Sequence, residues 1–163
     1  MTVNTIKRLA AIAAVSIVVS GAPLMANADA ATPYSGTKVI KTGKSYGDLV
    51  KSLNAAVKAN EMGLVTRASA NVGAKSLGKT IPGNMVVGVY RPDFAIRMLK
   101  ASVPAGIEAP IRFYITEDPA SGKATPTYRT PSSVFGPYKN ADLDTMAKEL
   151  DFIFAKIAAD ATN

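Results

Sequence analysis

The side chains best suited to chemistry are a group of arginines and tyrosines in the middle of the chain: Tyr90, Arg91, Arg97, Arg112 and Tyr114. A guanidinium group can bind a carboxylate or a phosphate through two parallel hydrogen bonds, and phenol rings can wall such a site. Tyr90 and Arg91 stand between an apolar run and Pro92, at the expected start of a helix, where free backbone N–H groups favour an anion. The pattern predicts a recess that accepts an acidic group.

A simpler interpretation of the same residues stays open. Asp93 and Arg97 lie four residues apart, which is the spacing of an ion pair on one face of a helix. Arg112 would then point to solvent from an alternating strand. If the three guanidinium groups lie on different faces, the recess does not form and a role in protein interaction replaces it.

The composition narrows the chemistry, because the chain has no histidine and no cysteine. We therefore expect no zinc, blue-copper or iron–sulfur site and no Ser–His or Cys–His nucleophile. Residues 73–76 (GAKS) are similar to the end of a phosphate-binding loop but are not preceded by the glycine that such a loop requires. A pair of carboxylates could still catalyse hydrolysis, although the acids are scattered over expected exposed faces and caps. We expect no metal, no cofactor and no enzymatic activity, with a carboxylate-based hydrolase as the weaker alternative.

The first 30 residues have the pattern of a secretory signal peptide. Lys7 and Arg8 precede an apolar run over residues 9–19, and Ala28 and Ala30 form an Ala-x-Ala cleavage motif. The run is shorter than the roughly 18–20 residues that span a bilayer. We expect cleavage after Ala30, or after Ala28 as second choice, and no stable membrane insertion of the product. The expected location is the periplasm or the exterior of the cell.

The charge balance bears on the partners. The chain has a formal net charge of +7, and removal of residues 1–30 leaves 17 basic and 11 acidic residues, or +6. The lysines are dispersed and never form a run of five, which indicates solubility rather than a nucleic-acid surface. We expect no nucleic-acid partner. The expected partners are a small anionic or amphipathic ligand, or a second copy of the chain in a homodimer.

A single α+β domain over residues 37–160 must position these side chains, after a flexible leader at 31–36. Hydrophobic periodicity and turn residues predict strands at 37–42, 64–69, 85–89, 111–116 and 124–130. Helices are expected after a Ser45 cap, at 71–78, from Arg91 to before Pro104, and at 142–159. Strand 85–89 reads as buried on both faces, Pro126 predicts an edge position for strand 124–130, and residues 131–140 read as a loop.

From Gly88 onward the chain resembles the DUF302 domain. The resemblance rests on residues 88–95 (GVYRPDFA), Leu99, residues 104–107 (PAGI) and residues 110–117 (PIRFYITE), and extends over roughly 71–138. It implies a curved antiparallel sheet with helices packed on one side, similar to the TBP-like arrangement and often dimeric. It implies no reaction.

One departure from the DUF302 pattern limits what can be transferred. Many relatives have a cysteine after the proline that opens the alternating strand, whereas Ile111 follows Pro110 here. A thiol or metal role for that cysteine therefore does not transfer to this chain. Relatives joined to export signals agree with the signal-peptide pattern, and an exported, non-catalytic ligand-binding domain is the favoured function. The alternative is a structural, dimerising envelope protein.

Overall fold

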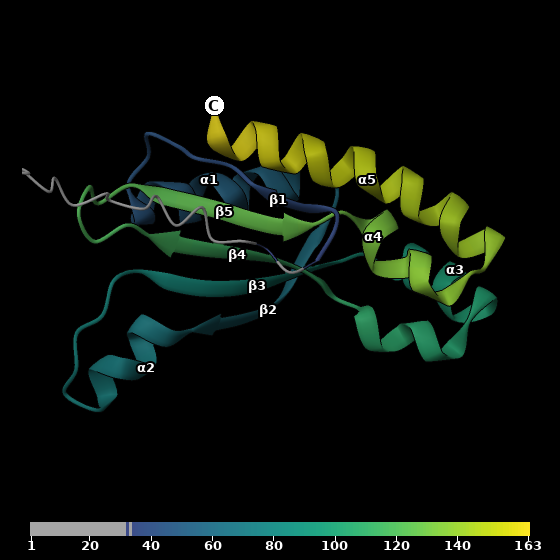
Figure 1. The fold of residues 1–163 in the computed structure, drawn as a ribbon, viewed down its shortest axis with the longest axis horizontal. Helices are drawn as coiled ribbons and strands as arrows, with labels where there is room; N and C mark the ends of the chain where they lie inside the picture. The colour runs from purple at the N-terminus through teal and green to yellow at the C-terminus, as the bar shows by residue number, and fades with distance from the viewer. Residues whose placement is uncertain (1–31, 33) are drawn as a thin grey trace, which may run out of the picture. The chain divides into compact units, whose positions relative to one another are not determined.

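The computed structural model describes Thr32 and residues 34–163; the predicted signal peptide at 1–30 lies outside the described residues. The strands are β1 (Thr37–Val39), β2 (Gly63–Ser69), β3 (Asn84–Tyr90), β4 (Ile111–Glu117) and β5 (Ala124–Arg129). The helices are α1 (Tyr46–Ala59), α2 (Ala70–Ser76), α3 (Pro92–Ala101), α4 (Pro131–Phe135) and α5 (Ala141–Thr162), with 3-10 turns η1 (Val103–Glu108) and η2 (Gly136–Tyr138). All strand pairs are antiparallel, in the order β1-β5-β4-β3-β2 (Figure 1). The predicted α+β class with an antiparallel sheet is confirmed.

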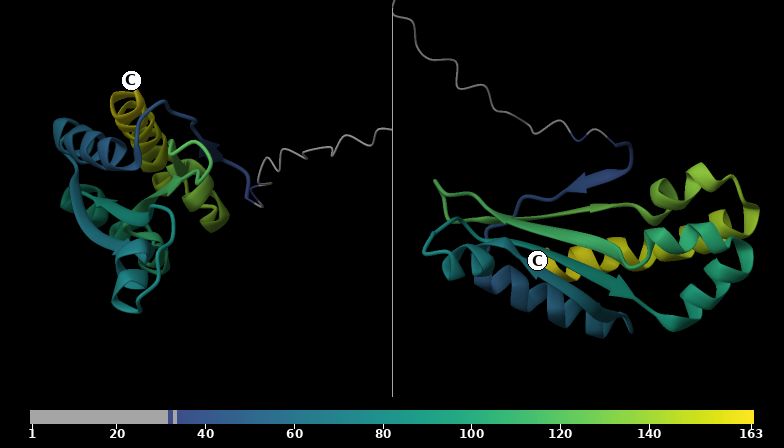
Figure 2. Two further views of the ribbon diagram at one scale, coloured as in Figure 1. Left: turned by 90° about the vertical axis from the view of Figure 1, so that its left-hand side faces the viewer. Right: turned by 90° about the horizontal axis from the view of Figure 1, so that it is seen from below.

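The two faces of the sheet differ in what covers them. α1 and α5 lie side by side across one face (Figure 2). Every second residue of the three middle strands is buried against them: Met85, Val87, Val89, Ile111, Phe113, Ile115, Ala124, Pro126 and Tyr128. The Phe154 ring of α5 stacks on Phe113 at 5.3 Å between centroids. The alternate residues, Arg112 and Tyr114 among them, point to the opposite side, which we call the open face.

The two long helices form where the apolar pattern predicts them. Ser45 caps α1 by accepting a hydrogen bond from the Asp48 backbone N–H (3.2 Å), and Asn140 caps α5 in the same way. The apolar stripe predicted for α5 is buried at Leu143, Met146, Leu150, Phe154 and Ile157 and half-buried at Ile153. Within the described part of the chain, no helix is long and apolar enough to cross a membrane.

The prediction that strand 124–130 lies at an edge is wrong, because β5 lies between β1 and β4. Pro126 is paired with Ile115 of β4 on one side. On the other side, the last residue of β1 is paired with Thr127, so the paired residues of β1 stop one position short of Pro126. The Pro126 carbonyl still accepts a bond from the Ile40 backbone N–H (3.1 Å). A proline is tolerated in this interior strand because it stands where the ladder to β1 stops.

Two further expectations need correction. β3 is fully buried on the helix side but only in part on the open face, where Gly88 is buried and Val86 and Tyr90 are half-buried. Residues 131–140 are not a loop but contain α4 and η2. Pro131 occupies the first turn of α4, where its missing N–H costs nothing, and Phe135 is buried in the core.

The segment before β1 contacts the domain. The guanidinium of Arg129 lies 4.9 Å from the ring centroid of Tyr34. The Gly36 carbonyl accepts a hydrogen bond from the Thr130 backbone N–H (2.9 Å). The later part of the predicted leader therefore packs on the end of β5, where it borders the site described next.

Candidate functional site

The five residues predicted to line one recess fall in two separate places. Register pairs Arg112 with Gly88 and Tyr114 with Val86, and Tyr90 lies two residues beyond Gly88 on β3. Tyr90, Arg112 and Tyr114 therefore share the open face. Arg91 and Arg97 flank the first turns of α3 instead, beside the helix layer. The single five-residue recess does not form.

Arg91 and Arg97 are already engaged by carboxylates of this chain. Arg91 donates to Asp93 through Nε (2.7 Å) and Nη2 (3.0 Å). Arg97 donates through both Nη atoms to Glu149 of α5, at 2.7 Å each, and not to Asp93 as the helical spacing predicts. Both guanidinium groups also lie over the Phe94 ring, at 4.4 and 5.3 Å from its centroid. Their bidentate sites are thus filled.

The pKa values of the two acids agree with this geometry. The hydrogen bond from Arg91 holds the pKa of Asp93 below its usual range, and the hydrogen bonds from Arg97 do the same for Glu149. A carboxyl with a lowered pKa stays charged at any pH where an ordinary carboxyl is charged. Both acids therefore stay charged through the neutral range, so a ligand at Arg91 or Arg97 would have to compete with a carboxylate of this chain.

A different pair of arginines meets on the open face. A cavity of about 150 Å³, which we call the arginine pocket, lies between β4, β5, η1 and α4, and is lined by Glu108, Ile111, Arg112, Tyr114, Thr127, Tyr128, Arg129 and Val134. Because Phe113 is paired with Tyr128, the next position along the hairpin sets Arg112 against Arg129. Like charges at directly opposed positions are unfavourable unless something compensates them.

Other groups of the protein compensate the positive charges of Arg112 and Arg129 only in part. Among the described residues, no ion pair joins Arg112 or Arg129 to an acid. Arg129 donates from Nη2 to the Ser133 carbonyl (3.1 Å), but its Nε is buried without a partner in the described part of the chain. Glu108, the one acid in the lining, accepts a hydrogen bond from the Tyr138 hydroxyl (3.2 Å). Two guanidinium groups thus border one hollow with hydrogen-bonding capacity to spare.

Sequence reasoning missed Arg129, although the sequence carried a signal for it. The predicted hairpin has its loop at 117–123, and pairing Glu117 with Ala124 fixes every later pair of the two strands. That register sets Arg129 beside Arg112. No sequence pattern predicted that η1 and α4 also line the arginine pocket, because their contact with the hairpin depends on tertiary packing.

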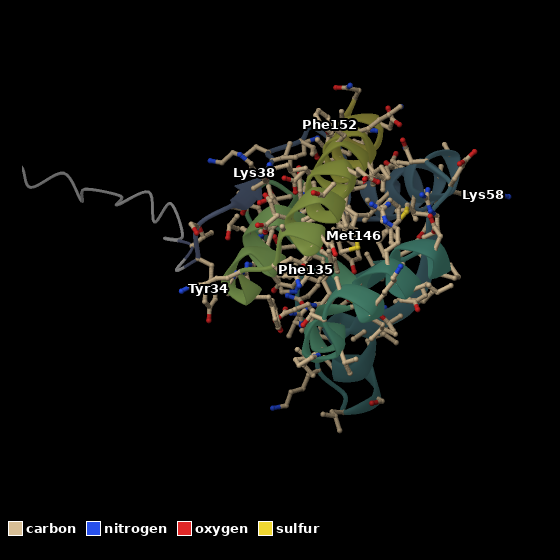
Figure 3. All side chains as sticks on the ribbon, turned by 90° about the vertical axis from the view of Figure 1, so that its right-hand side faces the viewer. Tyr34, Lys38, Lys58, Phe135, Met146 and Phe152 are labelled. Carbon is tan, nitrogen blue, oxygen red and sulfur yellow. The ribbon has the colours of Figure 1, made fainter. Side chains whose placement is uncertain are left out.

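A second, smaller cavity of about 30 Å³ lies beside the core, between β3, α3 and α5. Its lining is mainly apolar and includes Met62, Met98, Met146 and Phe135; the last two are labelled in Figure 3. A space of this size holds about one water molecule, and an apolar lining offers it few partners. Two of the predicted site residues, Tyr90 and Arg91, also line this cavity, which separates them from Arg112 and Tyr114. Over Thr32 and residues 34–163, no group of three or more acidic side chains is placed to hold a metal ion.

Comparison with known proteins identifies the fold. A crystal structure of an uncharacterized conserved DUF302 protein from Bacillus stearothermophilus superposes with a TM-score of 0.67 at 15% identity, covering 79% of this chain and 99% of that one. No protein of curated function matches the chain. The model of the family described as "Domain of unknown function DUF302" matches residues 38–160. The chain therefore belongs to the DUF302 family.

Proposed function

We propose that this chain is an exported, non-catalytic binding protein that holds a small anionic or amphipathic molecule in the arginine pocket. The observation that carries the proposal is the meeting of Arg112 and Arg129 at one hollow without an acid paired to either. Export is supported by the signal-peptide pattern of residues 1–30. A binding role is favoured over hydrolysis because Glu108 alone supplies a carboxylate to this pocket, whereas carboxylate-based hydrolysis uses two.

The pocket suits the acidic end of a molecule rather than a whole large ligand. Its volume of about 150 Å³ is below the roughly 300–1,000 Å³ of common ligand pockets. A carboxylate or a phosphate fits between two guanidinium forks, and the remainder of the ligand would extend along the open face past Tyr114, which is 38% exposed. Glu108 disfavours a second negative charge nearby. A monoanionic head with an apolar or aromatic tail is the class that these contacts favour.

Isothermal titration with a series of acids tests this proposal. The series contains acetate, benzoate, decanoate, inorganic phosphate and decyl phosphate. We expect Arg112→Ala to weaken binding of the best acid by about 10- to 100-fold, because a hydrogen bond to a charged group contributes about 1.5–3 kcal/mol. Arg112 is exposed on β4, so its loss should leave the unfolding midpoint nearly unchanged.

The matched control is Arg97→Ala. It removes another exposed arginine, one whose guanidinium is held by Glu149, and it should leave the affinity unchanged. Equal loss in both variants would point to nonspecific charge attraction. Unchanged binding in Arg112→Ala would exclude the arginine pocket.

A second function, homodimer formation, is favoured by an apolar surface on α3 and η1. Ile96, Leu99, Val103 and Ile107 are 69%, 46%, 71% and 83% exposed. Leu99 reaches across to η1, since its Cδ2 would lie 3.2 Å from a Cβ on Gly106. Exposed apolar patches of this kind mark interfaces, and nearby charges of both signs suit a self-complementary contact.

Light scattering during size-exclusion chromatography tests the dimer. We expect a dimer whose mass falls to that of the monomer in the double variant Val103→Ser/Ile107→Ser. Phe152→Ser, at a residue 79% exposed on α5, is the matched control and should remain dimeric. A wild-type monomer at every concentration, or an unchanged mass in the double variant, would contradict this second function.

A further inference from the structure

The connection between β2 and β3 projects from the domain without covering any of its core. We call residues 70–81, which comprise α2 and the turn after it, the α2 arm. α2 buries none of its residues and extends away from the sheet beyond β2 (Figure 1). Three large apolar side chains of the arm are exposed: Val72 at 62%, Leu77 at 76% and Ile81 at 41%. Exposed apolar side chains close together on one projecting segment can contact a partner outside this chain.

The charges carried by the arm have one sign, and the nearest acid that contacts its base is Glu117, which accepts a hydrogen bond from the Gly83 backbone N–H (2.6 Å). The sequence from Met62 to Pro92 contains no aspartate or glutamate. The arm itself carries Lys75 and Lys79, and no ion pair links either lysine to an acid within the part of the chain that the structure describes. The apolar surface of α3 and η1 differs, because Asp93 and Glu108 stand beside it. Exposed apolar side chains combined with two lysines and no acid on the arm itself favour an anionic lipid surface over a second copy of this basic chain.

Hydrogen bonds fix which side of the arm faces outward. The Asn71 side-chain oxygen accepts bonds from the hydroxyls of Ser69 (2.7 Å) and Tyr46 (3.3 Å) and from the Asn84 backbone N–H (3.3 Å). This side of α2 is thereby held against the domain. Val72 and Lys75, three residues apart and both exposed, share the outward side.

We propose that the α2 arm docks the protein on a membrane surface that contains anionic lipid. Val72, Leu77 and Ile81 enter the boundary between headgroups and acyl chains, while Lys75 and Lys79 lie at the lipid phosphates. The apolar contribution of three side chains is small, so the attachment is weak and reversible. Docking of this kind is peripheral and is independent of the arginine pocket.

Cosedimentation with vesicles tests the docking. The vesicles are phosphatidylcholine alone or phosphatidylcholine mixed with phosphatidylglycerol. We expect binding to the mixed vesicles only, and a decrease as salt screens the lysines. Lys75→Gln/Lys79→Gln should weaken this binding by roughly 10- to 30-fold, and Leu77→Ser/Ile81→Ser should weaken it at least as much. All four positions are exposed, so the unfolding midpoint of both variants should match that of the wild type.

The control is Lys148→Gln/Phe152→Ser on α5, which removes the same kinds of exposed side chain from another surface. This variant should bind the mixed vesicles as the wild type does. Absence of binding, binding that ignores phosphatidylglycerol, or equal loss in the control would overturn the proposal. It would also be overturned if Leu77→Ser/Ile81→Ser kept vesicle binding and instead changed the mass in solution, because the arm would then contact protein.

Discussion

Replacing Phe154 with alanine should lower the free energy of unfolding by about 3–5 kcal/mol. The Phe154 side chain is 1% exposed and stacks on Phe113, with Tyr128 at 6.1 Å between ring centroids. Its loss leaves a cavity between α5 and the sheet, where three aromatic rings meet. Because a domain of this size is stable by about 5–15 kcal/mol in total, urea denaturation followed by circular dichroism would show the change as a large fall in midpoint.

The control for this prediction lies two residues away. Phe152 is on the opposite side of α5 and is 79% exposed, so Phe152→Ala should change the stability by less than about 0.5 kcal/mol. The same small effect is expected for Lys148→Ala. Similar losses at positions 152 and 154 would mean that α5 presents a different side to the sheet.

The second large effect is expected from adding a methyl group at Gly88. A Cβ at this position would overlap the Thr66 hydroxyl and lie 2.5 Å from Cγ of Pro110. The proline ring cannot rotate away, so β3 or the start of β4 must shift. We expect Gly88→Ala to lower the unfolding free energy by about 1–3 kcal/mol, as measured by urea denaturation. Gly88 is paired with Arg112, and the shift should therefore weaken anion binding as well.

Gly73→Ala provides the comparison, because a Cβ there meets nothing within 4 Å. Gly73 lies inside α2, and alanine is the better helix former by about 0.5–1 kcal/mol. This variant should be as stable as the wild type or slightly more so. A neutral Gly88→Ala would contradict the close packing of Pro110 on β3.

Features set by local periodicity could be predicted from the sequence. The stripe of α5 and the alternation of β4 each repeat several times within one element, so few arrangements bury them. Pro126 gave a wrong prediction because a proline lacks only its own backbone N–H, which excludes one hydrogen bond and not a whole interior strand. β1 ends just before the position at which it would accept a hydrogen bond from residue 126. The helical turn of α4 was hidden by its prolines and glycine, which mark turns in isolation but here begin and follow a short helix.

The site was predictable only in part, because its partners are distant in sequence. Asp93 and Arg97 have ideal spacing for an ion pair, yet Arg97 binds Glu149, which lies 52 residues away on α5. No local pattern gives that contact. Arg112 and Tyr114 were correctly assigned to one strand face, and the register of the hairpin would have added Arg129. The predicted group of site residues thus combined arginines that the structure places on two different surfaces.

Native mass spectrometry of the protein purified from the cells that produce it tests the binding proposal most directly. We predict a mass above that of the chain by the mass of one small acidic molecule per subunit. The increment should disappear in Arg112→Ala and persist in Arg97→Ala, whose guanidinium is held by Glu149. A wild-type mass equal to that of the chain alone, or an increment that survives in Arg112→Ala, would contradict the assignment of the arginine pocket as the binding site.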